Sequence, residues 1–195
     1  MRFPATAPAT AHGHQLPTGG AALTATAVSA TMHCLTGCAI GEIAGMAIGT
    51  GLGFSTLGTV ALSVALAFAF GYGLTSLPLL RAGFALSAVI PIALASDTLS
   101  IATMEVVDNL IVVAVPGAMD AGLGSLLFWG SLSFALAVAA VVTIPVNRYL
   151  IARGKGHAAV HRTGVHGGPP VRLVAALTAA GFVFGAIVLL AEAVA

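Results

Sequence analysis

The stretch that decides the fold is residues 31–53, TMHCLTGCAIGEIAGMAIGTGLG. Most of its side chains are apolar or small. Glycine recurs at every fourth position, at Gly37, Gly41, Gly45, Gly49 and Gly53. Small residues at this spacing let the backbone of a second helix approach closely inside a membrane. The stretch therefore predicts a membrane-spanning helix whose glycine face packs against a neighbouring helix.

The same stretch carries polar and sulfur-bearing side chains beside the glycines. They are His33, Cys34, Cys38, Glu42 and Met46. An ionised acid at the bilayer centre costs about 3 kcal/mol or more, so acids inside membrane helices face protein or water and mark functional sites. We expect these side chains to line the edge of the glycine contact.

The composition of the whole chain also predicts a membrane protein. Of its 195 residues, 58% are hydrophobic and 7% are charged, whereas about a quarter of the residues in a soluble domain are charged. A bilayer span needs about 20 apolar residues. Five stretches qualify: residues 24–52, 56–79, 84–116, 123–151 and 172–194. We predict an all-α, multi-pass transmembrane domain over residues 23–195, preceded by a flexible cytoplasmic tail over residues 1–22.

Basic residues predict the orientation of the five spans. All seven fall on one side of the membrane: Arg2, Arg81, Arg148, Arg153, Lys155, Arg162 and Arg172. The positive-inside rule makes this side cytoplasmic, with the amino terminus inside and the carboxyl terminus outside. Because topology alone explains these charges, they do not indicate nucleic-acid binding. Membrane lipid is the expected surrounding partner.

The third span carries a second set of polar side chains, namely Asp97, Met104, Glu105 and Asp108. At about 100° per residue, Asp97, Met104 and Asp108 fall within one narrow stripe, and the fourth lies about 60° to one side. The first and third spans run in the same direction. A rise of about 1.5 Å per residue then places Glu42 level with Glu105, and Cys34 level with Asp97. We predict a polar seam between the first and third helices.

Sulfur and carboxylate side chains indicate what this seam binds. Thiols and thioethers favour copper(I), and carboxylates suit harder ions or protons. The expected metal ligands are Cys34, Cys38, Met104, His33 and Met46. The residues expected to carry protons or compensate charge are Glu42, Asp97, Glu105 and Asp108. The leading hypothesis is an integral membrane protein that binds, and translocates, a soft metal ion, with copper(I) as the first choice and as the only cofactor implied.

Other classes of function fit the same residues. Methionine also fills gaps in cores, and cysteine also acts as a small hydrophobe in tight contacts. The chain could then be a structural or assembly subunit whose seam binds a second copy, another membrane protein or a lipid. A metal-free proton or cation pathway is the third hypothesis. The sequence has no GxxxxGK[ST], GxSxG or HExxH motif, so no enzyme is predicted, although a redox role for the thiols stays open.

Histidines outside the spans form two groups. His12 and His14 belong to the tail, while His157, His161 and His166 belong to the expected cytoplasmic loop over residues 154–170. Imidazole is a common zinc and copper ligand, so metal capture is one interpretation. The other is a solvated, flexible loop whose basic residues meet anionic lipid headgroups. We prefer the second, because no cysteines at zinc-ligand spacing accompany the histidines.

Three parts of the sequence are distinctive when taken together. They are MHCLTGCAIGE at 32–42; MEVVDN at 104–109 with PGAMD at 116–120; and FWG at 128–130 with PVNR at 145–148 and KGH at 155–157. Together they resemble the bacterial membrane family called domain of unknown function 4396. The resemblance covers residues 30–160. It implies a protein of the bacterial cytoplasmic membrane and an association with copper proteins, and it implies no defined activity.

Overall fold

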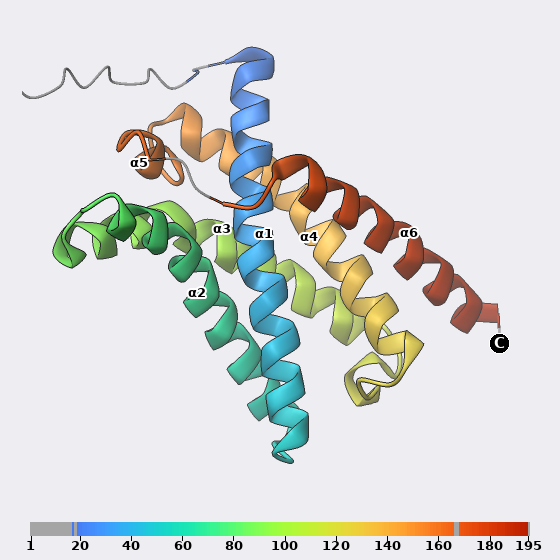
Figure 1. Ribbon diagram of the computed structural model, residues 1–195. Helices are drawn as coiled ribbons and strands as arrows, with labels where there is room; N and C mark the ends of the chain where they lie inside the picture. The colour runs from blue at the N-terminus through green and yellow to red at the C-terminus, as the bar shows by residue number, and fades with distance from the viewer. Residues whose placement is uncertain (1–16, 18, 166–167, 195) are drawn as a thin grey trace, which may run out of the picture.

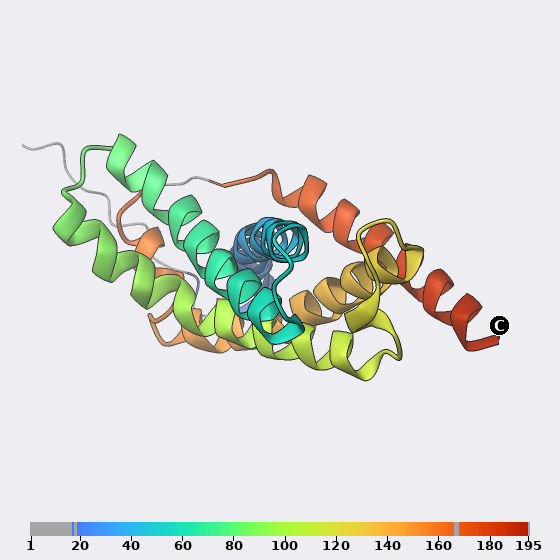
Figure 2. The ribbon, with the colours of Figure 1, turned by 90° about the horizontal axis from the view of Figure 1, so that it is seen from below.

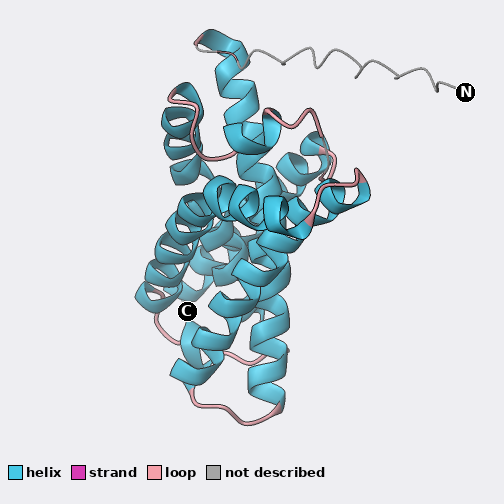
Figure 3. Ribbon diagram, turned by 90° about the vertical axis from the view of Figure 1, so that its left-hand side faces the viewer, coloured by secondary structure: helices cyan, strands magenta, loops and turns pink. Residues whose placement is uncertain are grey.

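The computed structural model describes residue 17 and residues 19–165 and 168–194. Its five long helices are α1 (Gly20–Gly51), α2 (Thr56–Arg81), α3 (Leu86–Ala114), α4 (Leu126–Ala152) and α6 (Val171–Val194). Two short ones, η1 (Ala118–Asp120) and α5 (Ala158–His161), lie in connecting loops. Within the described residues the chain forms helices and loops and no strand (Figure 3).

The five long helices coincide with the five predicted spans. Each is long and apolar enough to cross a membrane. The prediction of an all-α chain with five such helices is therefore confirmed for the described residues. The helix α1 begins at Gly20, so the last residues of the predicted tail belong to its first turn. The tail histidines His12 and His14, and His166 of the loop, lie outside the described residues.

Glycine and serine separate the first helices. Gly53 and Gly83, which follow α1 and α2, have φ angles of +70° and +88°, a conformation that glycine adopts without a steric penalty. Ser55 then caps the next helix, because its side chain accepts a hydrogen bond from the Gly58 backbone N–H at 3.2 Å. Such a cap satisfies one of the amide donors that the first turn of a helix leaves free.

The helix α1 stands at the centre of the bundle. In Figure 1 it runs upright while the other long helices cross it obliquely, and Figure 2 shows it end-on between α2 and α3 on one side and α4 and α6 on the other. It has buried residues along most of its length. By contrast, α6 packs mainly on α4 and buries only Gly185 and Val188 of its own residues. The central helix is the one that carries the glycine series.

Ionisable side chains are buried inside the bundle, and many large apolar side chains lie on its outer surface. Its buried residues include Glu42, Asp97, Glu105 and Asp108, while large apolar side chains such as Leu110 are exposed. A water-soluble protein shows the opposite distribution, because charged residues are rarely buried there. This distribution suits a lipid environment, in which ionisable side chains face the bundle interior.

Basic residues gather at one end of the bundle, which we call the basic end. There α2 and α4 end and α6 begins, and the basic residues of these helix ends and of the loop after α4 are Arg81, Arg148, Arg153, Lys155, Arg162 and Arg172. The opposite end holds the α1–α2 turn and the loop that contains η1. The two ends define the direction in which the buried polar residues are described below.

Candidate functional site

The glycine face of α1 packs against α2. A Cβ atom added at Gly37 would lie 2.6 Å from the Gly71 Cα atom, and one added at Gly41 would collide with the Ala67 backbone. A Cβ atom added at Gly45 would collide with the Ser63 Cα atom, and one added at Gly49 would lie 2.7 Å from the side-chain Oγ1 atom of Thr59. The glycines thus let α1 and α2 approach closely, and the neighbouring face of α1 turns its polar side chains toward α3.

Toward the basic end, α1 and α3 meet at Cys34 and Asp97. The Cys34 thiol donates a hydrogen bond to the Asp97 Oδ1 atom at 3.8 Å. The same oxygen lies 3.3 Å from the Nδ1 atom of His157, which comes from the loop after α4. Asp97 is 0% exposed. A buried carboxyl group here joins a thiol of α1 to a loop imidazole.

His33 lies at this level but faces another helix. Its Nε2 atom is 2.9 Å from the Thr75 hydroxyl of α2. Its ring lies 5.3 Å, between centroids, from the His157 ring. The Nδ1 atom of His33 is buried and has no hydrogen-bond partner among the described residues. The predicted metal ligand His33, although next to Cys34 in the sequence, therefore forms its hydrogen bond with Thr75 of α2 and not with Asp97.

Nearer the opposite end, three carboxyl groups converge. Glu42 of α1 interacts electrostatically with Asp108 of α3 and, less strongly, with Glu105. The Cys38 thiol interacts with Glu105. Sequence counting paired Glu42 with Glu105 by depth, whereas its stronger partner in the structure is Asp108. The difference arises because Asp108 lies in the same stripe of α3 as Asp97, and Glu105 lies to one side of that stripe.

Most oxygens of these carboxyl groups have no hydrogen-bond partner among the described residues. Both side-chain oxygens of Glu42, both of Glu105 and the Oδ1 atom of Asp108 are buried without a partner in the described part of the chain. Leaving buried polar atoms unpaired is costly, and more so when they are charged. Such oxygens are satisfied when neighbouring carboxyl groups share a proton or bind a cation. The cluster is therefore suited to holding positive charge.

Together these residues form a continuous series from one end of the bundle toward the other, which we call the polar column. Its members are Asp108, Glu42, Glu105, Cys38, Cys34, Asp97 and His157. Each interacts with the next through the pairs described above, and the two thiols, one helical turn apart on α1, also interact with each other. All seven side chains belong to buried residues.

A cavity opens onto the column at the opposite end. It measures about 190 Å³, which is room for roughly six water molecules. Its lining residues include Asp108 and Asn109 of α3, together with Met46 and Met119. The predicted ligand Met46 is half-buried here, away from the thiols. The carboxyl group of Asp108, the first in the column, thus lines a cavity at this end of the bundle.

The structure brings together only part of the predicted ligand set. Cys34, Cys38 and Met104 belong to one buried cluster, whereas His33 bonds to α2 and Met46 lines the cavity. In the residues that the structure describes, no group of three or more His, Cys, Asp and Glu side chains is spaced to hold a metal ion. Of the predicted soft ligands, the thiols of Cys34 and Cys38 and the thioether of Met104 therefore lie in the same buried cluster.

Two contributors to the site were missed by sequence reasoning. His157 was expected in a solvated loop, but it is 9% exposed and packs against Asp97, so that expectation is wrong for this residue. Asn147 of α4 donates hydrogen bonds to Thr31 at 2.9 Å and to Ser100 at 3.0 Å, which ties three helices together beside the column. An amide inside an apolar span was the signal that could have identified Asn147.

Comparison with known proteins places the chain in a family without a known activity. A family model described as a domain of unknown function (DUF4396) matches residues 24–156. The match covers α1 from residue 24 onward, all of α2, α3 and α4, and the start of the loop that follows. It contains every member of the polar column except His157, which is the next residue after its end. No curated protein and no solved structure matches the chain.

Proposed function

The chain belongs to the domain of unknown function 4396 family, and from the chemistry of its own polar column we propose that it binds a soft metal ion, copper(I) first, and moves it through a membrane. One observation carries the proposal. Thiols and carboxyl groups from α1 and α3 form one buried series beneath an open cavity. A buried series of this kind is costly to a membrane protein unless a cation or protons use it.

The sulfur atoms favour a soft ion. Cys34, Cys38 and Met104 share one buried cluster, and thiolate and thioether ligands prefer copper(I) to hard cations. Thiols lose their protons when they bind a metal. The adjacent Glu105 and Asp97 carboxyl groups can take up or release protons as the ion moves from one thiol to the other, so that charge stays balanced. Met46 and Met119, at the cavity, supply a first contact for an ion that arrives from that end.

Copper content tests the ligand assignment. Protein purified after loading with copper(I) under reducing conditions is expected to retain about one ion per chain, and Cys34→Ser to lose most of it, because serine replaces a soft ligand by a hard one. Met104→Leu should weaken binding in the same direction. The matched control is Met32→Leu. Met32 belongs to the same buried cluster, but it lines an apolar groove between α4 and α6. Equal copper in all four proteins would contradict the assignment.

Orientation is part of the proposal. The basic end faces the cytoplasm of a bacterial cell by the positive-inside rule, so the cavity faces outward. In a cysteine-free background, Gly122→Cys should react in intact cells with a membrane-impermeant maleimide, whereas Lys155→Cys should react only after the cells are opened. Both positions are exposed. Labelling of Lys155→Cys in intact cells would reverse the orientation.

A metal-free proton or cation pathway is the second candidate. It is favoured by the carboxyl oxygens of Glu42 and Glu105, which have no partner among the described residues and can be satisfied by shared protons. The two candidates give different results: a copper-free protein that conducts protons supports the second and excludes the first. A protein that does neither would support the remaining hypothesis, a structural or assembly subunit that binds a second copy, another membrane protein or a lipid.

A further inference from the structure

Two arginines lie where α4 ends, at the basic end of the bundle. Arg148 belongs to the last turns of α4, and Arg153 directly follows the helix. Together with Tyr149 they line a cavity of about 350 Å³, which we call the arginine cavity. In the part of the chain that the structure describes, neither arginine forms an ion pair with an acid. The cavity therefore presents two positive charges that no neighbouring carboxylate compensates.

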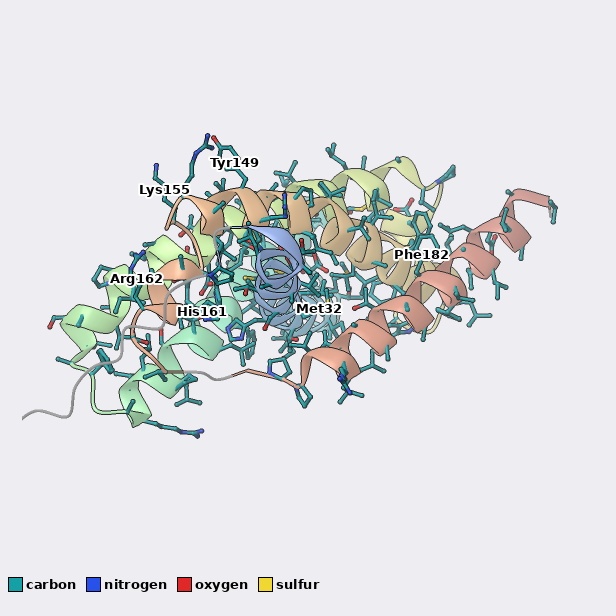
Figure 4. The ribbon with its side chains drawn as sticks, turned by 90° about the horizontal axis from the view of Figure 1, so that it is seen from above. Met32, Tyr149, Lys155, His161, Arg162 and Phe182 are labelled. Atoms are coloured by element: carbon teal, nitrogen blue, oxygen red, sulfur yellow. The ribbon has the colours of Figure 1, made fainter. Side chains whose placement is uncertain are left out.

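Neighbouring side chains hold both guanidinium groups in place. The Arg148 Nε atom donates a hydrogen bond to the Thr24 hydroxyl of α1 at 3.2 Å. The guanidinium carbon of Arg153 lies 3.7 Å from the centre of the Tyr149 ring, which is a cation–π contact. Figure 4 shows Tyr149 projecting from the bundle on the same side as Lys155. Because the bond to Thr24 uses only Nε, the two terminal nitrogens of Arg148 remain as donors for an outside partner.

An apolar groove begins beside Arg148 and continues toward the middle of the bundle. It lies between α1, α4 and α6 and has a volume of about 450 Å³, within the range of about 300–1,000 Å³ that ligand sites occupy. Val141 and Ile144 of α4 line it, and Arg148 follows them by seven and four residues, hence on the same face of the helix. On α1, Thr24 precedes the groove residue Val28 by one turn. Arg148 and Thr24 therefore mark the basic end of the groove.

The groove offers almost nothing to a polar ligand. Small side chains from α4 and α6 make the room in it, namely Ala137, Ala140, Ala175 and Ala179. Thr178 is the polar member of its lining, and the Thr178 hydroxyl already donates a hydrogen bond to the Val174 carbonyl oxygen. An apolar space without free donors and acceptors does not hold ordered water. Its surface suits a hydrocarbon chain.

We propose that the arginine cavity and the apolar groove together bind one anionic phospholipid. The phosphate of its headgroup accepts hydrogen bonds from Arg148 and Arg153, and one acyl chain lies in the groove between α4 and α6. Guanidinium groups pair with phosphate through two parallel hydrogen bonds, and basic pockets between membrane helices bind anionic headgroups. The inference is independent of the proposed function, because no member of the polar column takes part.

Charge favours a lipid over a second copy of the chain as the occupant. Outside the polar column the acidic residues are Asp120 and Glu192. Asp120 lies in η1, at the opposite end, and Glu192 lies near the end of α6, which begins at the basic end. Copies inserted in the same direction would therefore bring neither acid to Arg148 and Arg153. An anionic lipid supplies the missing negative charge at the correct end.

Competition between two lipids tests the headgroup contact. Full-length protein in detergent micelles with equal amounts of phosphatidylglycerol and phosphatidylcholine, carrying the same acyl chains, is analysed by native mass spectrometry. The wild type is expected to retain one phosphatidylglycerol with at least about tenfold preference, because each arginine near a headgroup favours an anionic lipid about fivefold. The double variant Arg148→Gln with Arg153→Gln should lose this preference. The matched control is Arg81→Gln with Arg172→Gln, which removes two exposed arginines of the same end that line neither space, and it should keep the preference.

Filling the groove tests the acyl-chain contact. Ala179 is exposed and lines the groove, so the ring of Ala179→Phe takes the place of the chain, and retention of phosphatidylglycerol should fall at least about tenfold. Ala180, the next residue, is also exposed but does not line the groove, so Ala180→Phe should retain the lipid as the wild type does. Size-exclusion chromatography and melting temperature show which variants are folded. The phenylalanine pair decides the matter if the arginine variants do not fold.

Five results would overturn the inference. Three of them are equal retention of both lipids by the wild type, equal preference in the two double variants, and equal retention in the two phenylalanine variants. Displacement of the lipid by inorganic phosphate would assign the arginine cavity to a free anion. A dimer without bound lipid that Ala179→Phe separates would assign the groove to a second copy. None of the five bears on copper binding, so the proposed metal function is judged separately.

Discussion

Replacing Gly41 with leucine is expected to lower the free energy of unfolding by about 3 kcal/mol or more, at or beyond the upper end of the usual cost of overpacking. A Cβ atom at Gly41 would collide with the nitrogen and Cα atoms of Ala67. Backbone atoms cannot turn aside as a side chain does, so α1 and α2 must move apart. Unfolding of the purified protein in mixed micelles, followed by circular dichroism, measures the loss.

A matched control exists in the facing helix. Gly73 of α2 is exposed, and no atom lies within 4 Å of a Cβ added there. Gly73→Leu should change the free energy of unfolding by no more than about 0.5 kcal/mol, as substitutions at exposed positions usually do. If Gly41→Leu and Gly73→Leu were equally stable, the close contact between α1 and α2 would not contribute to stability.

Replacing Glu42 with glutamine is expected to lower the number of protons released on copper(I) binding by about one. Glu42 is 1% exposed, and both of its carboxyl oxygens lack hydrogen-bond partners in the described residues. Arrival of a cation favours the ionised carboxyl group, so a proton leaves. Glutamine keeps the shape of the side chain but has no proton to lose. Isothermal titration in buffers of different ionisation enthalpy counts the released protons.

Glu192→Gln is the control for this experiment. Glu192 lies near the end of α6 and is exposed, far along the chain from the column, so the number of released protons should not change. Glu42→Gln itself should fold normally, because exchanging a buried ionisable group for a neutral one of the same shape is often neutral or stabilising. Proton release that is identical in the wild type and in Glu42→Gln would make the carboxyl groups structural, and would favour the assembly-subunit hypothesis.

The sequence alone determined the five helices, and it predicted their ends to within four residues. A bilayer demands about 20 apolar residues per span and a backbone whose hydrogen bonds are satisfied within each helix. Both demands are local, so composition along the chain was sufficient. The same regularity allowed depth to be counted along α1 and α3, which run in the same direction. The count put Cys34 level with Asp97, and in the structure their side chains are in contact at 3.8 Å.

Tertiary structure decided which helices are neighbours and that His157, from the loop after α4, lies at one end of the polar column. The glycine spacing shows that a helix lies close to α1 but not which one; the structure places α2 there and turns the polar face toward α3. Which helix lies beside which depends on how the surfaces of all five long helices pack together. The spacing of residues within a single helix does not contain that information. His157 is the clearest case. A glycine-rich loop is expected to be solvated when only the sequence is considered. The imidazole of His157 is buried because it packs against the buried carboxyl group of Asp97, which lies 60 residues earlier in the chain.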